Sequence, residues 1–164
     1  MSRVERPKRS TYDRALDMLE ARARGSEELR RLLVRKGEPP ADVDAAIARL
    51  QANGLLDDAT YARQFARSKL LGAGLSRRRL QQELSRRGVD RELSADAIDA
   101  VFTDEAVDDA ATIERVAQKK LRTLSKLDAA TQRRRLYAFL ARRGYDADDI
   151  QRALRTLLAG DVNP

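Results

Sequence analysis

The sequence predicts an all-α protein built as three tandem three-helix repeats that form an elongated, curved array. The main observation is one pattern that occurs three times: two leucines four residues apart, a basic pair and a glycine. The three copies occupy residues 29–37, 80–88 and 136–144. Their glycines stand 51 and 56 residues apart, which is the period of a helical repeat. No segment of useful length alternates apolar and polar residues with the period of two that indicates a strand.

Each copy has the features of a helix end. Leucines at i and i+4 share one helix face, the basic pair lies in the last turn, and the glycine stops the helix. Ten and thirteen residues after each glycine apolar residues return, as Ile47 and Leu50 do in the first copy, so the copies share a following helix as well. Because a unit of about 50 residues buries little core alone, neighbouring units are expected to supplement it.

Breaks between these patterns predict the domain boundaries. The expected segments are a basic tail at 1–10, three-helix repeats at 11–56, 57–102 and 103–158, and a C-terminal tail at 159–164. The helices expected in the first repeat run from Thr11 to Gly25, from Ser26 to Gly37 and from about Ala41 to Asn53. Ser26 suits an N-cap, and Pro39 and Pro40 break the chain before the third helix.

The second and third repeats follow the same order. In repeat 2 the expected helices start at Asp57 or Asp58, at Ser76 and after Gly88, and the last ends near Phe102; in repeat 3 they run from about Asp104 to Leu121, Asp128 to Arg143 and Asp146 to Leu158. Gly72 and Gly74 are expected to interrupt the chain between the first two helices of repeat 2. Ser94 replaces the apolar residue of the other two repeats, which suggests that this third helix is shifted or starts late.

The composition argues against catalysis. The chain has no cysteine and no histidine, so it lacks disulfides, thiolate chemistry, the usual general base and the commonest zinc ligand. Acidic pairs at 57–58, 108–109 and 148–149 lie near helix starts, where capping explains them better than magnesium binding does. The sequence therefore predicts a protein that is not an enzyme and needs no cofactor or metal.

The same composition indicates a soluble protein. No apolar run approaches the roughly 18 residues that cross a membrane. The basic N-terminus lacks the apolar region of a secretory signal. We expect a cytoplasmic monomer with no membrane partner.

The net charge of +7 conceals a strong alternation of basic and acidic segments. Residues 63–91 carry nine basic and two acidic side chains, residues 92–114 carry none and eight, and residues 115–143 carry ten and one. Charge separated in this way suggests a surface that follows a partner of matching charge. The basic pairs before the glycines have a structural explanation, because a cation in the last helical turn contributes about 0.3–1 kcal/mol.

Two arginine triplets, at 77–79 and 133–135, lack that explanation. They occupy equivalent positions of repeats 2 and 3, in the expected first helical turn, where positive charge opposes the helix dipole. Repeat 1 has Ser26, Glu27 and Glu28 there, so the fold tolerates acids at this place. A functional role is therefore favoured over random drift of solvated residues.

Helical geometry selects the members of a binding stripe. At 100° per residue, Arg78 and Arg79 point about 120–140° away from the leucines of their helix. Arg77 and Arg87 lie only about 40° from the core direction, so their stems are expected to cover the apolar flank. The predicted partner-binding residues are Arg78, Arg79, Gln82 and Arg86 in repeat 2, continued by Arg134, Arg135 and Arg142 in repeat 3.

Repeat 2 carries a more specific resemblance. Residues 53–58 read Asn-Gly-Leu-Leu-Asp-Asp and are followed by Tyr61 and Phe65, and residues 79–89 carry the leucine and glycine pattern. In order and spacing the chain resembles the bacterial RecX family, regulators of the RecA recombinase, over roughly residues 12–158. The resemblance implies tandem three-helix repeats. It also implies a protein that binds the groove of the RecA–DNA filament, bridges protomers, and restrains ATP hydrolysis, strand exchange and co-protease action on a LexA-type repressor.

Two functions therefore compete. The first is a non-enzymatic regulator whose partner is the RecA filament, with some contribution from phosphates of single- or double-stranded DNA. The alternative is an autonomous basic helical module that binds nucleic acid. Against the alternative, the acidic segments lie on the presumed recognition-type helices, and no base-reading group of Arg, Asn and Gln stands out.

Overall fold

The protein is all-helical. The structure, a computed structural model, describes residues 9–159, and in that range it has nine α-helices and no strand, which confirms the predicted fold class. Repeat 1 contains α1 (Thr11–Ala21), α2 (Ser26–Arg35) and α3 (Pro40–Ala52); repeat 2 contains α4 (Asp58–Ala73), α5 (Arg77–Arg86) and α6 (Arg91–Asp104); repeat 3 contains α7 (Asp109–Arg122), α8 (Ala129–Arg142) and α9 (Ala147–Leu158). The tails predicted at 1–10 and 159–164 lie almost wholly outside the described residues.

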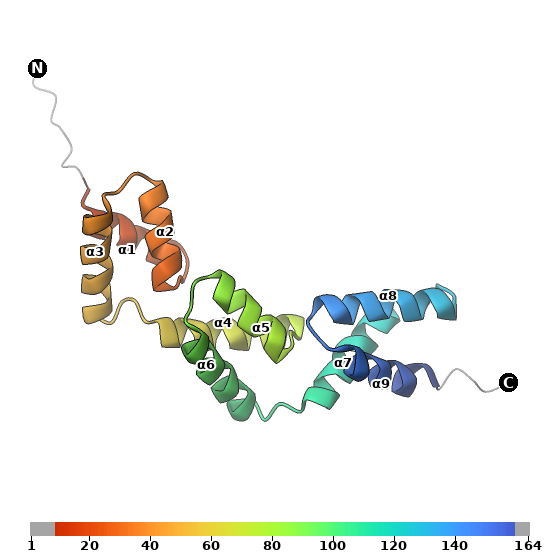
Figure 1. Ribbon diagram of the computed structural model, residues 1–164. Coiled ribbons are helices and arrows are strands. Elements are labelled where there is room, and N and C mark those ends of the chain that lie inside the picture. Colours follow the sequence, from red (N-terminus) through yellow and green to blue (C-terminus); the bar gives the residue numbers. More distant parts are fainter. Residues whose placement is uncertain (1–8, 160–164) are drawn as a thin grey trace, which may run out of the picture.

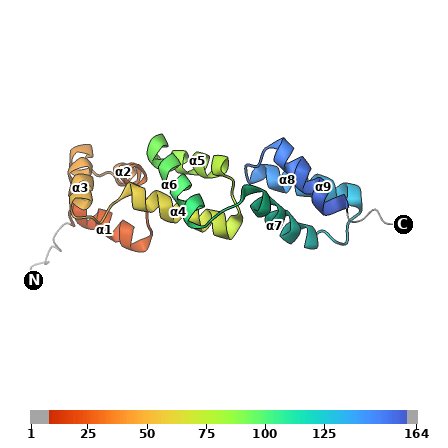
Figure 2. The ribbon, with the colours of Figure 1, turned by 90° about the horizontal axis from the view of Figure 1, so that it is seen from below.

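The three repeats form an elongated row. Figure 1 and Figure 2 show three separate groups of three helices, with α1–α3 at one end, α4–α6 in the middle and α7–α9 at the other end. Within each group the first and third helices pack together, and the second helix closes the unit. At least half of the residues of α5 and α8 are exposed to solvent, whereas most residues of α2 are not.

Most helices begin at a capping side chain. Four residues at which the sequence places a helix start accept a hydrogen bond from a backbone N–H of the first turn: Asp57, Ser76, Asp128 and Asp146. The prediction for Ser26 is wrong, because Gly25 holds the N-cap position and Ser26 is the first helical residue. The N–H and hydroxyl of Ser26 instead donate to the carboxylate of Asp58 at the start of α4.

Several predicted helix boundaries differ from the structure. The first helix of repeat 3 starts at Asp109 instead of Asp104, because Asp108 accepts hydrogen bonds from the first turn and Asp104 ends α6. Helix α1 ends at Ala21, four residues before Gly25. Helix α4 passes through Gly72, and it ends where Gly74 adopts a left-handed φ of 62°. A glycine therefore reliably ends a helix only where the backbone needs a positive φ.

The third helix of repeat 2 is not shifted. Asp90 caps α6 at the position equivalent to the other repeats, and Ser94 is fully buried in the place of an apolar residue. The Ser94 hydroxyl donates a 2.6 Å hydrogen bond to the carbonyl oxygen of Asp90. The polar side chain is thus satisfied within its own helix, and the expected late start is wrong.

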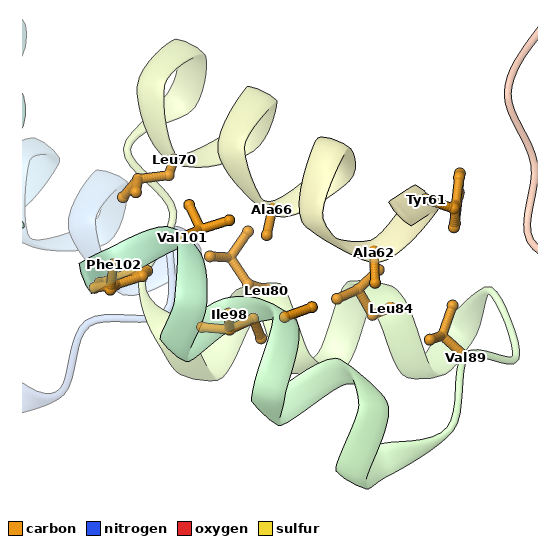
Figure 3. Packing of buried hydrophobic residues seen from close by; sticks show 11 residues of the cluster. Tyr61, Ala62, Ala66, Leu70, Leu80, Leu84, Val89, Ile98, Val101 and Phe102 are labelled. Atoms are coloured by element: carbon orange, nitrogen blue, oxygen red, sulfur yellow. The ribbon is translucent and has the colours of Figure 1, made fainter. Parts of the chain in front are cut away.

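Each repeat has its own hydrophobic core. In repeat 2, Leu80 of α5 lies near Ala66 of α4 and Val101 of α6, and Leu84 lies near Ala62 of α4, as Figure 3 shows. Repeats 1 and 3 each bury an equivalent cluster built on their paired leucines. The buried residues of the three repeats form separate clusters.

The junction of repeats 1 and 2 contains polar contacts, and the two repeats approach each other closely there. Asp58 of α4 accepts the hydrogen bonds from Ser26, and the ring of Tyr61 lies against the backbone of Gly25. A Cβ atom added to Gly88, in the turn after α5, would lie within 3.0 Å of the Glu27 side chain. Helix α2 therefore rests with its N-terminal turn on the next repeat.

The junction of repeats 2 and 3 uses equivalent surfaces and more hydrogen bonds. Ser76 N–H donates to the Arg143 carbonyl at 3.0 Å, and Arg143 Nε donates to the Ala73 carbonyl at 2.8 Å. The Tyr145 hydroxyl donates to the Gly74 carbonyl at 2.7 Å. These bonds hold the N-terminal turn of α5 against the turn that follows α8.

Tyr145 makes this junction sensitive to alkaline pH. Burial, together with the charge of Asp109, raises the pKa of Tyr145 from 10.0 to about 12. Between pH 10 and 12 the unfolded chain releases this proton while the folded protein keeps it, so the free energy of unfolding falls as pH rises through that window. The pKa difference predicts a loss of about 2–3 kcal/mol there.

Tyr145→Phe is the matched variant for this effect. At pH 7 it loses the bond to Gly74 and about 1 kcal/mol of stability. Between pH 10 and 12 its unfolding free energy should fall less than that of the wild type, as measured by urea unfolding at each pH. Parallel curves for the two proteins across that window would contradict the role given to the Tyr145 proton.

Candidate partner-binding surface

The described part of the chain offers no catalytic constellation. Among residues 9–159, no three Cys, His, Asp or Glu side chains gather into a metal-binding group. Asp57 and Asp108 cap α4 and α7, as predicted for their acidic pairs, whereas Asp148 and Asp149 lie in the first turn of α9, which Asp146 caps. No described helix is long and apolar enough to cross a membrane.

Only some of the predicted binding residues of repeat 2 are available to a partner. Arg78, Gln82 and Arg86 are exposed, whereas Arg79 is half-buried and forms a 2.8 Å ion pair with Glu83. Arg78 Nε donates a 3.2 Å hydrogen bond to the carbonyl oxygen of Gly144 in repeat 3. The equal exposure expected of Arg78 and Arg79 is therefore wrong for Arg79, because the turn at Gly144 covers it.

Glu83 neutralises much of the positive charge on α5. Its carboxylate lies 2.8 Å from Arg79, 3.4 Å from Arg86 and 3.0 Å from Arg87. Partial burial alone raises the pKa of Glu83, but the hydrogen bond from Arg87 and the three positive charges outweigh it and bring the pKa below its usual value. The carboxylate is thus ionised at neutral pH and offsets the charge that α5 presents to a partner.

The stems of Arg77 and Arg87 cover apolar surface, as predicted. The Arg77 guanidinium lies 3.9 Å from the centre of the Phe102 ring, and that of Arg87 lies 4.4 Å from the centre of the Phe65 ring. Arg77 also pairs with Asp99 and, at 3.7 Å, with Asp109 of the next repeat. Both arginines are therefore structural.

The predicted residues of repeat 3 are exposed. Arg134, Arg135 and Arg142 lie on the solvent side of α8. Helix α8 begins at Ala129, so the triplet at 133–135 lies in its second turn instead of its first. The dipole cost expected for this triplet therefore does not apply, because the effect is confined to the terminal turn. No ion pair in residues 9–159 involves these three side chains.

Repeat 3 also holds basic residues that the helical projection missed. The ten basic side chains of residues 115–143 form no ion pair with the described acidic residues, whereas most arginines of α1, α2 and α5 are paired. The additional cations of α7 and the turn after it are Arg115, Lys119, Lys120, Arg122 and Lys126. The sequence signal was present, since this segment has ten basic residues and one acidic residue.

Two of these cations contact an aromatic ring. The Arg143 guanidinium lies 3.6 Å from the centre of the Phe139 ring, and the Lys120 ammonium of α7 lies 5.3 Å from it. Arg135 and Arg142 stand four residues before and three residues after Phe139, so they border the same flank of α8. We call Lys120, Arg135, Phe139, Arg142 and Arg143 the Phe139 patch.

Large apolar side chains are exposed elsewhere. In residues 9–159 they are Val34 on α2, Leu55 between repeats 1 and 2, and Leu71 on α4. Protein interfaces usually centre on apolar or aromatic residues that become fully buried, whereas nucleic-acid interfaces are polar and positive. The Phe139 patch is polar and positive, with one half-buried aromatic ring among its cations.

Three tandem three-helix units define a helical repeat protein. Comparison with known proteins agrees: residues 12–50, 57–98 and 107–154 match the first, second and third three-helix domains of RecX. The chain belongs to the RecX family of regulatory proteins.

Individual relatives support this assignment over most of the chain. The regulatory protein RecX of Pelodictyon phaeoclathratiforme is 31% identical, with 88% of this chain and 86% of the relative covered. That of Amycolatopsis mediterranei is 38% identical, with 88% and 83% covered. The crystal structure of RecX from Lactobacillus salivarius superposes with a TM-score of 0.70 at 20% identity, covering 91% of this chain and 95% of that one, and so shares the fold.

Proposed function

We propose that this protein is a non-enzymatic regulator of RecA that binds in the groove of the RecA–DNA filament. Bound there, it restrains the ATPase, strand-exchange and co-protease activities of the filament in recombination, DNA repair and the SOS response. The observation that carries the proposal is the match of all three repeats to successive RecX domains in one continuous array.

The architecture supports this proposal physically. A helical filament presents the same surface at regular intervals, and a row of similar repeats presents its own surface at regular intervals. The hydrogen bonds and ion pairs across the two junctions set the spacing of those surfaces. The predicted contacts remain Arg78, Arg79, Gln82 and Arg86 on α5 and Arg134, Arg135 and Arg142 on α8. We expect the residues of α8 to contribute more to binding than those of α5.

The DNA-stimulated ATPase of the cognate RecA tests the proposal. RecA on single-stranded DNA is assayed at about 150 mM salt, where exposed charges are screened beyond about 8 Å. The protein is titrated in, with excess free DNA as a control. Inhibition that excess DNA does not relieve is expected. Inhibition below one protein per RecA protomer would favour capping of filament ends over coating of the groove.

The exposed cations of repeat 3 favour one alternative, an autonomous nucleic-acid-binding module. Such a module would inhibit RecA by sequestering DNA, and excess DNA would relieve the inhibition completely. Its binding would also fall by orders of magnitude between about 50 and 200 mM salt. Either no inhibition or inhibition abolished by competitor DNA would therefore contradict the proposed regulation of the filament.

A further inference from the structure

We propose that the Phe139 patch of repeat 3 binds the phosphate backbone of DNA. This inference deepens the proposed function, because it assigns DNA contact to one end of the array. It is nevertheless testable without RecA, since it concerns a direct contact between this chain and nucleic acid.

The first argument is the state of the charges. Arg135 and Arg142 are exposed, and neither forms an ion pair with the described residues. The equivalent position to Arg142 in repeat 2 is Arg86, which lies 3.4 Å from Glu83. A phosphate that approaches Arg142 therefore displaces no carboxylate, whereas one that approaches Arg86 competes with an existing partner.

The second argument is the fixed position of the patch. Phe139 holds Arg143 against its ring at 3.6 Å, and Arg143 Nε is anchored by the Ala73 carbonyl at 2.8 Å. Burial lowers the pKa of Arg143, but a guanidinium stays charged at neutral pH. Lys120 reaches the same ring from α7. Lys120 and Arg143 are thus held beside the exposed Arg135 and Arg142 before any ligand binds, which reduces the entropy that these two cations lose on binding.

The third argument concerns the class of partner. The exposed large apolar side chains of the described region lie in repeats 1 and 2, at Val34, Leu55 and Leu71. Repeat 3 exposes Arg115, Lys119 and Arg122 along the outer face of α7 instead. A surface whose exposed side chains are mostly cations, with no large exposed aliphatic residue, fits phosphates better than it fits an acidic protein. The partly exposed Phe139 ring, set among cations, is also typical of surfaces that bind single strands.

The test compares two doubly substituted proteins that lose the same charge. Arg135→Ala with Arg142→Ala removes the exposed cations of the patch, and Arg63→Ala with Arg91→Ala removes two exposed arginines of repeat 2. All four side chains are exposed and have no ion pair among residues 9–159, so both variants should keep wild-type helicity by circular dichroism. The probe is a fluorescent single-stranded oligonucleotide, followed by anisotropy between about 50 and 200 mM salt.

The patch variant is expected to bind about tenfold more weakly at low salt, with a salt slope smaller by about 0.7 for each lost phosphate contact. The control should stay within about twofold of the wild type. Equal binding and equal slopes for the two variants would overturn the proposal. Loss of RecA inhibition by a patch variant that still binds DNA normally would also overturn it, because the patch would then contact protein. If the patch variant loses DNA binding but even the wild type leaves RecA uninhibited, the inference stands and the proposed function fails.

Discussion

Gly144→Ala is expected to destabilise the protein far more than Gly37→Ala, although both glycines end the equivalent helix of their repeat. Both have a left-handed φ, 91° and 86°, so both substitutions cost about 1–2 kcal/mol of backbone strain. At Gly144 the new Cβ would also lie 2.6 Å from Arg79 Cβ and 3.1 Å from Arg79 N, whereas at Gly37 it meets nothing within 4 Å. Forcing the two repeats apart should add about 1–3 kcal/mol.

Urea unfolding followed by far-ultraviolet circular dichroism measures both costs. The difference between the two variants isolates the junction, because the φ strain is common to them. The same loss of unfolding free energy in both would show that α5 does not rest on the turn at Gly144.

Arg142→Glu is expected to weaken the inhibition of RecA more than the same change at either equivalent position. Arg35, Arg86 and Arg142 each precede the glycine of their repeat by two residues, so the helix-dipole cost of the substitution is shared. Arg142 belongs to the unneutralised surface of repeat 3, whereas Arg86 already faces Glu83 at 3.4 Å. We expect the half-inhibitory concentration to rise about tenfold for Arg142→Glu and about two- to threefold for Arg86→Glu.

The readout is the RecA ATPase titration with each of the three variants, after circular dichroism has shown equal helicity. Arg35→Glu in repeat 1 supplies the reference for a charge reversal far from repeat 3. A larger effect at Arg86 or Arg35 than at Arg142 would contradict the assignment of the main charged contact to repeat 3.

Much of the fold was predictable because the signals are local. Paired leucines, a capping Asp or Ser and a terminal glycine act within one or two turns, and Ser76 and Asp128 cap where the sequence placed them. The start of α7 was predicted wrongly because Asp104 and Asp108 are both suitable caps. The choice depends on α6, whose Val101 and Phe102 are buried in the core of repeat 2 and keep the chain helical up to Asp104.

The candidate surface was less predictable because it depends on distant contacts. The helical projection found the exposed positions of α8, but it contains no information on Glu83, whose three ion pairs depend on side-chain conformations. It also missed that Arg79 is covered by Gly144, 65 residues away in the sequence. The Phe139 patch joins Lys120 of α7 to Arg143 after α8, which only the packing of the two helices brings together.

Capture on immobilised DNA tests the central claim most directly. Beads carry single-stranded DNA, either bare or coated with RecA filaments held by a non-hydrolysable ATP analogue, at about 150 mM salt and with excess free DNA in solution. The account predicts that the protein is retained on the filament-coated beads and washes off the bare ones. Equal retention on both, or retention that free DNA abolishes, would contradict a regulator that recognises the RecA filament.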